Sequence, residues 1–175
     1  MFALPPEARE PDFIQLFEYW CRLAPPGGLP GRQHLDPIDM PRALLPRVAL
    51  FEVEHAIDGA HFRVRLAGTK VVDMLGREPR GRMLHQLGLA ESGSLGSALK
   101  AVVTLAAPVV YSAPLALPRN RQAWARRLAL PLAGDGTNVD MVLGLYLLRD
   151  AALAGPSGLV IFDRLRRERR FGIAG

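Results

Sequence analysis

The chain has 175 residues, of which 49% are apolar, and it carries a formal net charge of +5. This length fits a single domain, and the apolar content excludes a chain that is mainly disordered. The positive charge is concentrated in residues 163–170 (DRLRRERR), where five arginines accompany one Asp and one Glu. The body of the chain is therefore not expected to present a basic groove for nucleic acid.

Three features bear on the compartment. Cys21 is the single cysteine, so no intramolecular disulfide can form, which fits a reducing environment. The start, MFALPPEAREPDF, lacks the basic and apolar regions of a secretory signal. The longest apolar runs, AVVTLAAPVV and MVLGLYLL, are shorter than the roughly 18 residues that a membrane helix needs. We expect a soluble cytoplasmic protein without a transmembrane segment.

The first predicted element is an amphipathic helix over residues 12–24 (DFIQLFEYWCRLA). Its apolar side chains at helical spacing are Phe13, Leu16, Phe17 and Trp20, and the following PPGGLPG cannot continue the helix. This aromatic stripe has to be covered. It either packs on the rest of the chain or forms the interface of a homodimer, because aromatic side chains favour protein interfaces. The four residues are therefore candidate dimer contacts.

Two strands joined by a tight turn are predicted next. Residues 48–54 (VALFEVE) form the first strand, and residues 61–67 (HFRVRLA) alternate in polarity, with Phe62, Val64 and Leu66 on one face. The Ile-Asp-Gly sequence between the two segments predicts a hairpin turn.

The centre of the chain predicts a series of short helices. Residues 68–76 (GTKVVDMLG) have Thr69 as candidate N-cap and Gly76 as a stop signal. The sequence REPRG then predicts a turn before a helical piece at residues 81–89 (GRMLHQLGL). The longest central helix is predicted over residues 91–107 (ESGSLGSALKAVVTLAA), with a serine as its cap and a proline directly after it.

Three further strands are predicted at residues 109–117 (VVYSAPLAL), 123–132 (AWARRLALPL) and 139–148 (VDMVLGLYLL). The end of the chain, residues 158–175, predicts a short helix with a basic surface. The strands thus fall into two antiparallel sets around the helices, which indicates an α+β domain.

This element order resembles the PAS fold, and the phrase GREPRGR resembles the Gly-x-x-Pro-x-Gly connector between two short helices of that fold. More closely, the chain resembles a bacterial family of small stand-alone PAS-like proteins. The phrases that carry this likeness are Trp20 in the first helix, LPGRQHLDPIDMPRALLP, FRVRLAGTKVVDMLGREPRGR and LALPLAGDG, and they fall within residues 13–150. The resemblance implies a five-stranded antiparallel sheet with short helices on one face, in addition to the N-terminal amphipathic helix.

On this resemblance we divide the chain into three parts: an N-terminal helix and Pro/Gly connector (1–35), a PAS-like domain (36–150) and a C-terminal basic segment (151–175). The resemblance implies a non-catalytic sensory or regulatory domain that acts by contact with a signalling protein, as a homodimer. A small apolar ligand in the cavity between sheet and helices would gate that contact. Alternation and helical spacing give the candidate cavity wall: Phe62, Val64, Leu66, Leu75, Leu84, Leu99, Val103, Trp124 and Leu128.

Other ligand motifs are absent or incomplete. Gly76 and Gly81 have the spacing of a phosphate-binding loop, but Arg82-Met83 stands where Lys-Ser/Thr is required. The four histidines are not paired at metal-binding spacing. Haem and flavin motifs are also missing: residues 91–107 contain no histidine, His85 only precedes them, and Cys21 lies far from this region. No cofactor or metal is predicted.

Two alternatives to the sensory role remain open. The first is a small enzyme on a cone-shaped α+β fold, which would need a buried carboxylate or histidine with a shifted pKa facing a pocket. The apolar strand faces offer no carboxylate, since Asp135 lies in a turn and Asp140 at a strand start. The second is a binder of anionic nucleic acid or membrane surfaces through the arginines of residues 164–170, although nucleic acid is not the expected partner.

Overall fold

Six antiparallel strands form one sheet in the order β2-β1-β5-β4-β3-β6. The structure, a computed structural model, describes residues 2–88, 93–117, 121–150 and 158–162. The strands are β1 (Val48–Ala56), β2 (Gly59–Ala67), β3 (Val109–Leu117), β4 (Arg121–Leu132), β5 (Met141–Asp150) and β6 (Gly158–Ile161). The helices are α1 (Pro11–Leu23), α2 (Thr69–Leu75) and α3 (Ser94–Leu105), with 3₁₀ turns η1 (Pro6–Ala8), η2 (Arg32–His34), η3 (Leu45–Arg47) and η4 (His85–Leu87).

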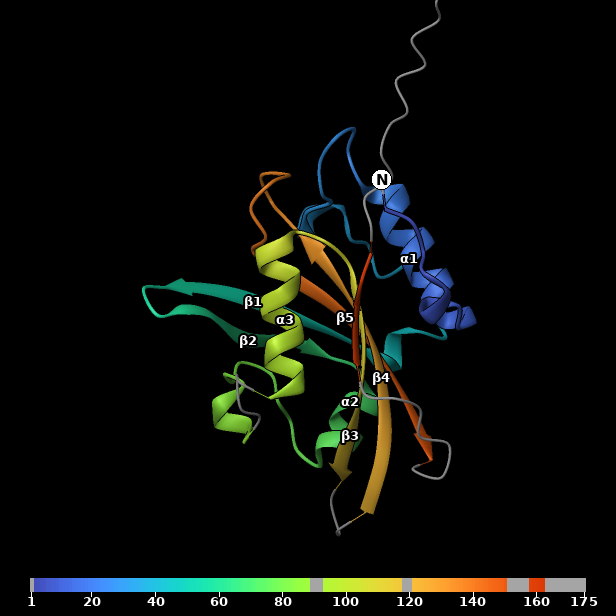
Figure 1. Cartoon of the computed structure of the whole chain (residues 1–175), viewed down its shortest axis with the longest axis vertical. Coiled ribbons are helices and arrows are strands. Elements are labelled where there is room, and N and C mark those ends of the chain that lie inside the picture. The colour runs from blue at the N-terminus through green and yellow to red at the C-terminus, as the bar shows by residue number, and fades with distance from the viewer. Residues whose placement is uncertain (1, 89–92, 118–120, 151–157, 163–175) are drawn as a thin grey trace, which may run out of the picture.

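Helices cover both faces of this sheet. In Figure 1, α1 lies on one side of strands β4 and β5 and α3 lies on the other. Successive residues of a strand point to opposite faces, so Arg126 and Leu128 of β4 point toward α1 while Arg127 points toward α3. An ion pair between Arg126 and Glu10, the residue that precedes α1, agrees with this assignment. Because both faces are covered, residues 128–132 of β4 and 142–147 of β5 are buried on both sides of the sheet.

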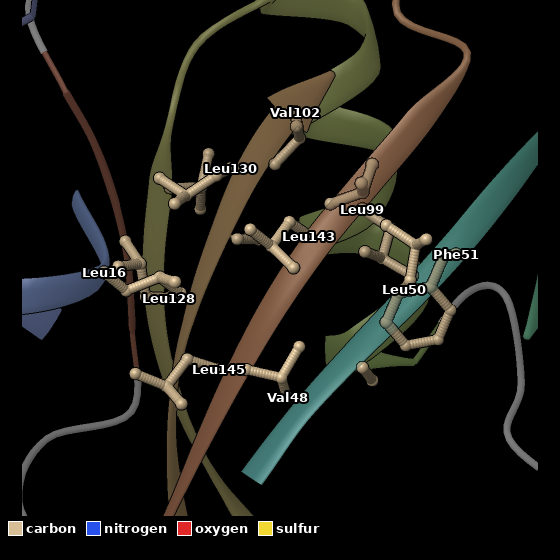
Figure 2. Packing of buried hydrophobic residues seen from close by; sticks show 14 of the residues in the cluster. Leu16, Val48, Leu50, Phe51, Leu99, Val102, Leu128, Leu130, Leu143 and Leu145 are labelled. Atoms are coloured by element: carbon tan, nitrogen blue, oxygen red, sulfur yellow. The ribbon is translucent and has the colours of Figure 1, made fainter. Parts of the chain in front are cut away.

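Helix α1 packs on the sheet of its own chain. Figure 2 shows Leu16 of α1 pointing toward Leu128 of β4, and both side chains are fully buried. The indole Nε1 of Trp20 donates a hydrogen bond to the carbonyl oxygen of Pro131, 2.8 Å away. The Phe17 ring lies 5.2 Å, centroid to centroid, from the ring of Phe162. One continuous core thus joins α1 to the sheet, across the division proposed at residue 35.

A β-bulge in the first hairpin changes one predicted face. Leu50 pairs with Leu66, but the next residue, Phe51, pairs with Val64, so Arg65 is the extra residue. The bulge moves Leu66 to the face opposite Val64, where 41% of its surface is exposed. The prediction that Leu66 shares a face with Phe62 and Val64 was therefore wrong, because an alternating pattern in the sequence does not reveal an inserted residue.

Helix α2 and its boundaries follow the sequence closely. Gly76 ends the helix in the left-handed conformation (φ 68°), as predicted. Thr69 is the first helical residue and not the N-cap; that position is held by Gly68. A Cβ atom on Gly68 would lie 2.3 Å from the carbonyl oxygen of Leu45. The close approach of the η3 backbone therefore requires glycine here.

The segment after α2 runs along the outer edge of β2. Backbone hydrogen bonds join Val64 N to Arg82 O (2.9 Å), Gly81 N to Val64 O (2.7 Å) and Leu84 N to Phe62 O (3.0 Å). The helix predicted over residues 81–89 is reduced to η4, which ends at the left-handed Gly88 (φ 65°). The backbone donors and acceptors at the start of this segment pair with the strand edge, so they are not available to a helix.

The C-terminal part of the described chain differs from its prediction. Residues 158–161 form β6, which pairs with β3 from Val109 to Ser112, so the short helix predicted from residue 158 was wrong at its start. The sheet therefore has one strand more than the five expected. The arginine-rich residues 163–170 lie outside the described residues. The long central helix was predicted correctly, but its N-cap is Gly93 and no side chain caps it.

Candidate functional site

A cavity of about 320 Å³ lies between the sheet and the layer formed by α2, η4 and the start of α3. Its floor comes from the five strands β1 to β5, and its side-chain lining there includes Ala49, Phe51, Val64, Leu115, Arg127 and Tyr146. Its roof comes from the helical layer and includes Val71, Met74, Leu75, Leu84, Leu87 and Leu95. The interior is thus mainly aliphatic and aromatic, and Arg127 is the single charged side chain that the described residues contribute to its lining.

Small residues in the sheet leave room for this cavity. Ala49 of β1 lines the floor, and its register partner on β5 is Gly144. A Cβ atom at Gly144 would lie 3.2 Å from Cε2 of Tyr146 and 3.5 Å from Cε2 of Phe51. Without that atom, the two rings can lie close to the floor of the cavity.

Arg127 is the one charged residue that is buried in the described part of the chain, with 4% of its surface exposed. Its guanidinium carbon lies 5.2 Å from the ring centroid of Tyr111 and 5.7 Å from that of Tyr146. Tyr111 is its direct register partner on β3, and Tyr146 is its partner on β5. The three side chains therefore form one cross-strand cluster, with the cation between two aromatic rings. We call these three residues the arginine–tyrosine cluster.

Two of the three guanidinium nitrogen atoms of Arg127 have no hydrogen-bond partner among the described residues. These two atoms, Nε and Nη1, are buried. The neighbouring tyrosines do not supply a negative charge. Burial raises the pKa of Tyr111 well above its ordinary value, and burial raises the pKa of Tyr146 to about 12, with Arg127 opposing the shift. Both phenols are neutral at physiological pH.

The free energy of unfolding is expected to fall as pH rises from about 10 to about 12. The folded state holds the Tyr146 proton more tightly than the unfolded state, so this contribution is fully present below pH 10 and is lost as pH rises through the folded pKa of about 12. The loss attributable to this side chain should reach about 1 kcal/mol by about pH 11. Urea unfolding of the wild type and of Tyr146→Phe at about pH 8 and about pH 11 isolates this contribution. If the free energies of unfolding of the two proteins differ by the same amount at both pH values, this prediction is wrong.

Sequence comparison identifies the family of this fold. A family model described as PAS domain matches residues 8–147. The chain belongs to the PAS domain family. Among solved structures, the crystal structure of a Rhodobacter sphaeroides LOV protein is similar to this PAS domain at 18% sequence identity and a TM-score of 0.44. That match covers 61% of the present chain and 63% of the LOV protein chain. No curated protein sequence matches the chain.

The structure separates the predicted cavity residues of this PAS domain into three groups. Val64, Leu75 and Leu84 line the cavity. Phe62 and Leu99 are buried and Val103 is partly buried, but none of the three lines it. Trp124 and Leu128 lie on the opposite face, toward α1, and Leu66 leaves the face through the bulge. For these last three residues the prediction was wrong.

The two strongest polar features of the cavity, Arg127 and Tyr146, were not predicted. Alternation along β4 predicts that Trp124 and Leu128 face the cavity, and hence that Arg127 faces away from it. A usable signal was nevertheless present, because Arg126 and Arg127 are consecutive in a strand. When both faces of such a strand are covered, one of two consecutive arginines has to point inward.

The candidate dimer contacts are buried inside the chain. Phe13, Leu16, Phe17 and Trp20 all pack in the core formed by α1 and the sheet. This is the first of the two interpretations that the sequence left open. A homodimer stays a prediction, and a surface other than this stripe would have to form it.

The residues of the cavity do not fit a haem or a flavin–thiol site. The described part of the lining contains no histidine and no cysteine. His85 is exposed, and Cys21 is in α1, on the other side of the sheet. Among the described residues, no three His, Cys, Asp or Glu side chains are grouped to hold a metal ion. None of the described helices is both long and apolar enough to cross a membrane.

Proposed function

We propose that this PAS domain is a non-catalytic sensor in which a small molecule bound in the cavity changes the surface shown to a partner protein. Family membership supports a sensory or regulatory role. The observation that carries the proposal is the cavity itself, whose volume of about 320 Å³ falls within the range of small-molecule sites. Its mainly apolar lining suits a ligand with an apolar body.

The roof of the cavity is the part most suited to change its conformation when a ligand binds. We define the lid as residues 69–88, which comprise α2, the connector and η4. It consists of short elements that are separated by the left-handed glycines Gly76 and Gly88. Short elements with few buried contacts open at lower free energy than a central sheet. A ligand that favours one lid arrangement would shift the population toward it and so bias partner binding.

The lining of the cavity supports the non-catalytic role. An enzyme on this scaffold would need a general acid or base within reach of a substrate. Among the described residues, no carboxylate and no histidine lines the cavity. The alternative of an anionic-surface binder depends on residues 163–170, which lie outside the described residues. The cytoplasmic location and the partner protein remain expectations within this proposal.

The proposal is tested on protein purified from its own host. Native mass spectrometry should find a small molecule on the wild type and much less of it on Ala49→Leu, which fills part of the cavity from its floor. Ala60→Leu, at a half-buried position of β2 that does not line the cavity, is the matched control and should retain the molecule. Hydrogen exchange of residues 69–88 should then slow when the molecule is bound. If the wild type carries nothing and its lid exchanges as fast as in Ala49→Leu, the proposal is wrong.

A further inference from the structure

Arg127 is an unusual residue for the floor of an apolar cavity. An arginine remains protonated at any physiological pH, and its guanidinium has five N–H donors. Here it is almost fully buried, and two of its nitrogen atoms have no partner among the described residues. A buried charge without a partner is strongly unfavourable. Within the described residues the site is therefore incomplete.

The surroundings do not supply the missing negative charge. The described residues give Arg127 no ion pair, and its neighbours Tyr111 and Tyr146 are neutral phenols. Glu10 is on the other face of the sheet, where it binds Arg126 at 2.5 Å and Arg149 at 3.7 Å. The aromatic rings stabilise the cation through their faces, but ring faces leave the guanidinium N–H donors without acceptors.

We infer that the cavity binds a small organic monocarboxylate, whose carboxylate group pairs with Arg127 and whose apolar body fills the space beneath the lid. This inference rests on the proposed sensory function and names the chemical class of its ligand. A carboxylate can accept two parallel hydrogen bonds from one guanidinium. A single arginine in a mainly apolar lining matches one monovalent anion better than a phosphate group, which is usually bound by several donors.

The dimensions of the cavity set the size of the acid. Its volume of about 320 Å³ equals roughly ten water molecules at about 30 Å³ each, which corresponds to an acid of about ten to fifteen non-hydrogen atoms. Met74, Leu84, Leu87 and Leu95 of the roof would contact the apolar body. The charged end and the apolar end of the ligand would thus engage the sheet and the lid at the same time, so that its occupancy is transmitted to the lid.

Calorimetric titration with two carboxylates and their neutral amides tests this inference. Octanoate and 4-phenylbutanoate are the probes, and octanamide and 4-phenylbutanamide have the same shape without the charge. We expect the wild type to bind at least one of the acids about tenfold or more tightly than its amide. Arg127→Met should reduce that preference to about twofold or less, and Arg127→Lys should retain part of it. Arg149→Met, the same change at a half-exposed site on the other face, should leave the preference unchanged.

The outcomes separate this inference from the sensory proposal. Equal binding of acid and amide, abolished in both cases by Ala49→Leu, would overturn the carboxylate assignment and leave the cavity as a ligand site. A preference for acid that persists in Arg127→Met would also overturn the assignment. If neither acid binds the wild type, the assignment fails, whereas the native mass spectrum of the host protein still decides the sensory proposal. Circular dichroism and thermal unfolding of each variant establish whether it is folded. If Arg127→Met is unfolded, the acid-to-amide preference of Arg127→Lys decides the assignment.

Discussion

Replacing Trp20 with alanine is expected to lower the free energy of unfolding by about 3–5 kcal/mol. Trp20 is 2% exposed, and the centroid of its ring lies 5.8 Å from the ring centroid of Phe2 and 5.9 Å from that of Phe17. Truncation would leave a cavity between α1 and the sheet. It would also leave the carbonyl oxygen of Pro131 without the hydrogen bond that the indole donates. Urea unfolding monitored by circular dichroism measures the change.

Two controls make the Trp20 result specific. Trp20→Phe keeps much of the packing but loses the hydrogen bond, and should cost about 1–2 kcal/mol. Ile57→Ala, at a fully exposed hairpin tip, should change the free energy of unfolding by about 0.5 kcal/mol or less. If Trp20→Ala leaves this free energy unchanged and instead dissociates a dimer, as measured by sedimentation, then α1 is an intermolecular element and its packing described above does not hold in solution.

Replacing Arg127 with methionine is expected to raise the free energy of unfolding of the ligand-free protein by about 1–3 kcal/mol. Methionine removes a buried charge whose Nε and Nη1 lack partners, and it refills much of the same volume with an adaptable apolar side chain. The contacts with the rings of Tyr111 and Tyr146 are lost, which offsets part of the gain by about 2 kcal/mol at most. A stabilising change at a functional residue is typical of sites that are kept for binding.

Arg149→Met is the matched comparison for this measurement. Arg149 is half-exposed, and its 3.7 Å contact with Glu10 duplicates the shorter one from Arg126. Its replacement should change the free energy of unfolding by about 0.5 kcal/mol or less. A loss of more than about 1 kcal/mol in Arg127→Met would instead mean that the arginine is satisfied within the folded chain, which would remove the main support for a bound carboxylate.

The element order was predictable because each element has strong local signals. The Pro/Gly connector, the Ile-Asp-Gly turn and Gly76 are local determinants, and five of the six strands and the three α-helices lie where they predict. Strand β6 was missed because its four residues are ordered by pairing with β3 across about fifty residues of sequence. Four residues are too few to show a clear alternating pattern of their own.

The cavity was predicted only in part, because the faces of the central strands cannot be assigned from alternation alone. In β4 both faces are buried, so the choice between Leu128 and Arg127 for the inner face depends on where α1 packs. In β2 the bulge at Arg65 reverses the faces beyond it. Val64, Leu75 and Leu84 were found because they lie in segments with one buried face, where the pattern has a single solution.

Backbone from the same chain pairs with the edge of β2 and with the outer side of β3, so that the four-residue β6 is the outermost strand at that end of the sheet. The connector pairs with β2 from Phe62 to Val64, and β6 pairs with β3 from Val109 to Ser112. Unpaired strand edges are where another chain can join a sheet by adding a strand. Over these residues of β2 and β3 that route is closed, and on the β3 side the free edge is reduced to the four residues of β6. A partner protein would have to recognise side chains on the lid or on α1, pair with the short edge of β6, or displace β6. Displacement of β6 would also disturb the contact between Phe162 and Phe17 that joins this strand to the N-terminal helix.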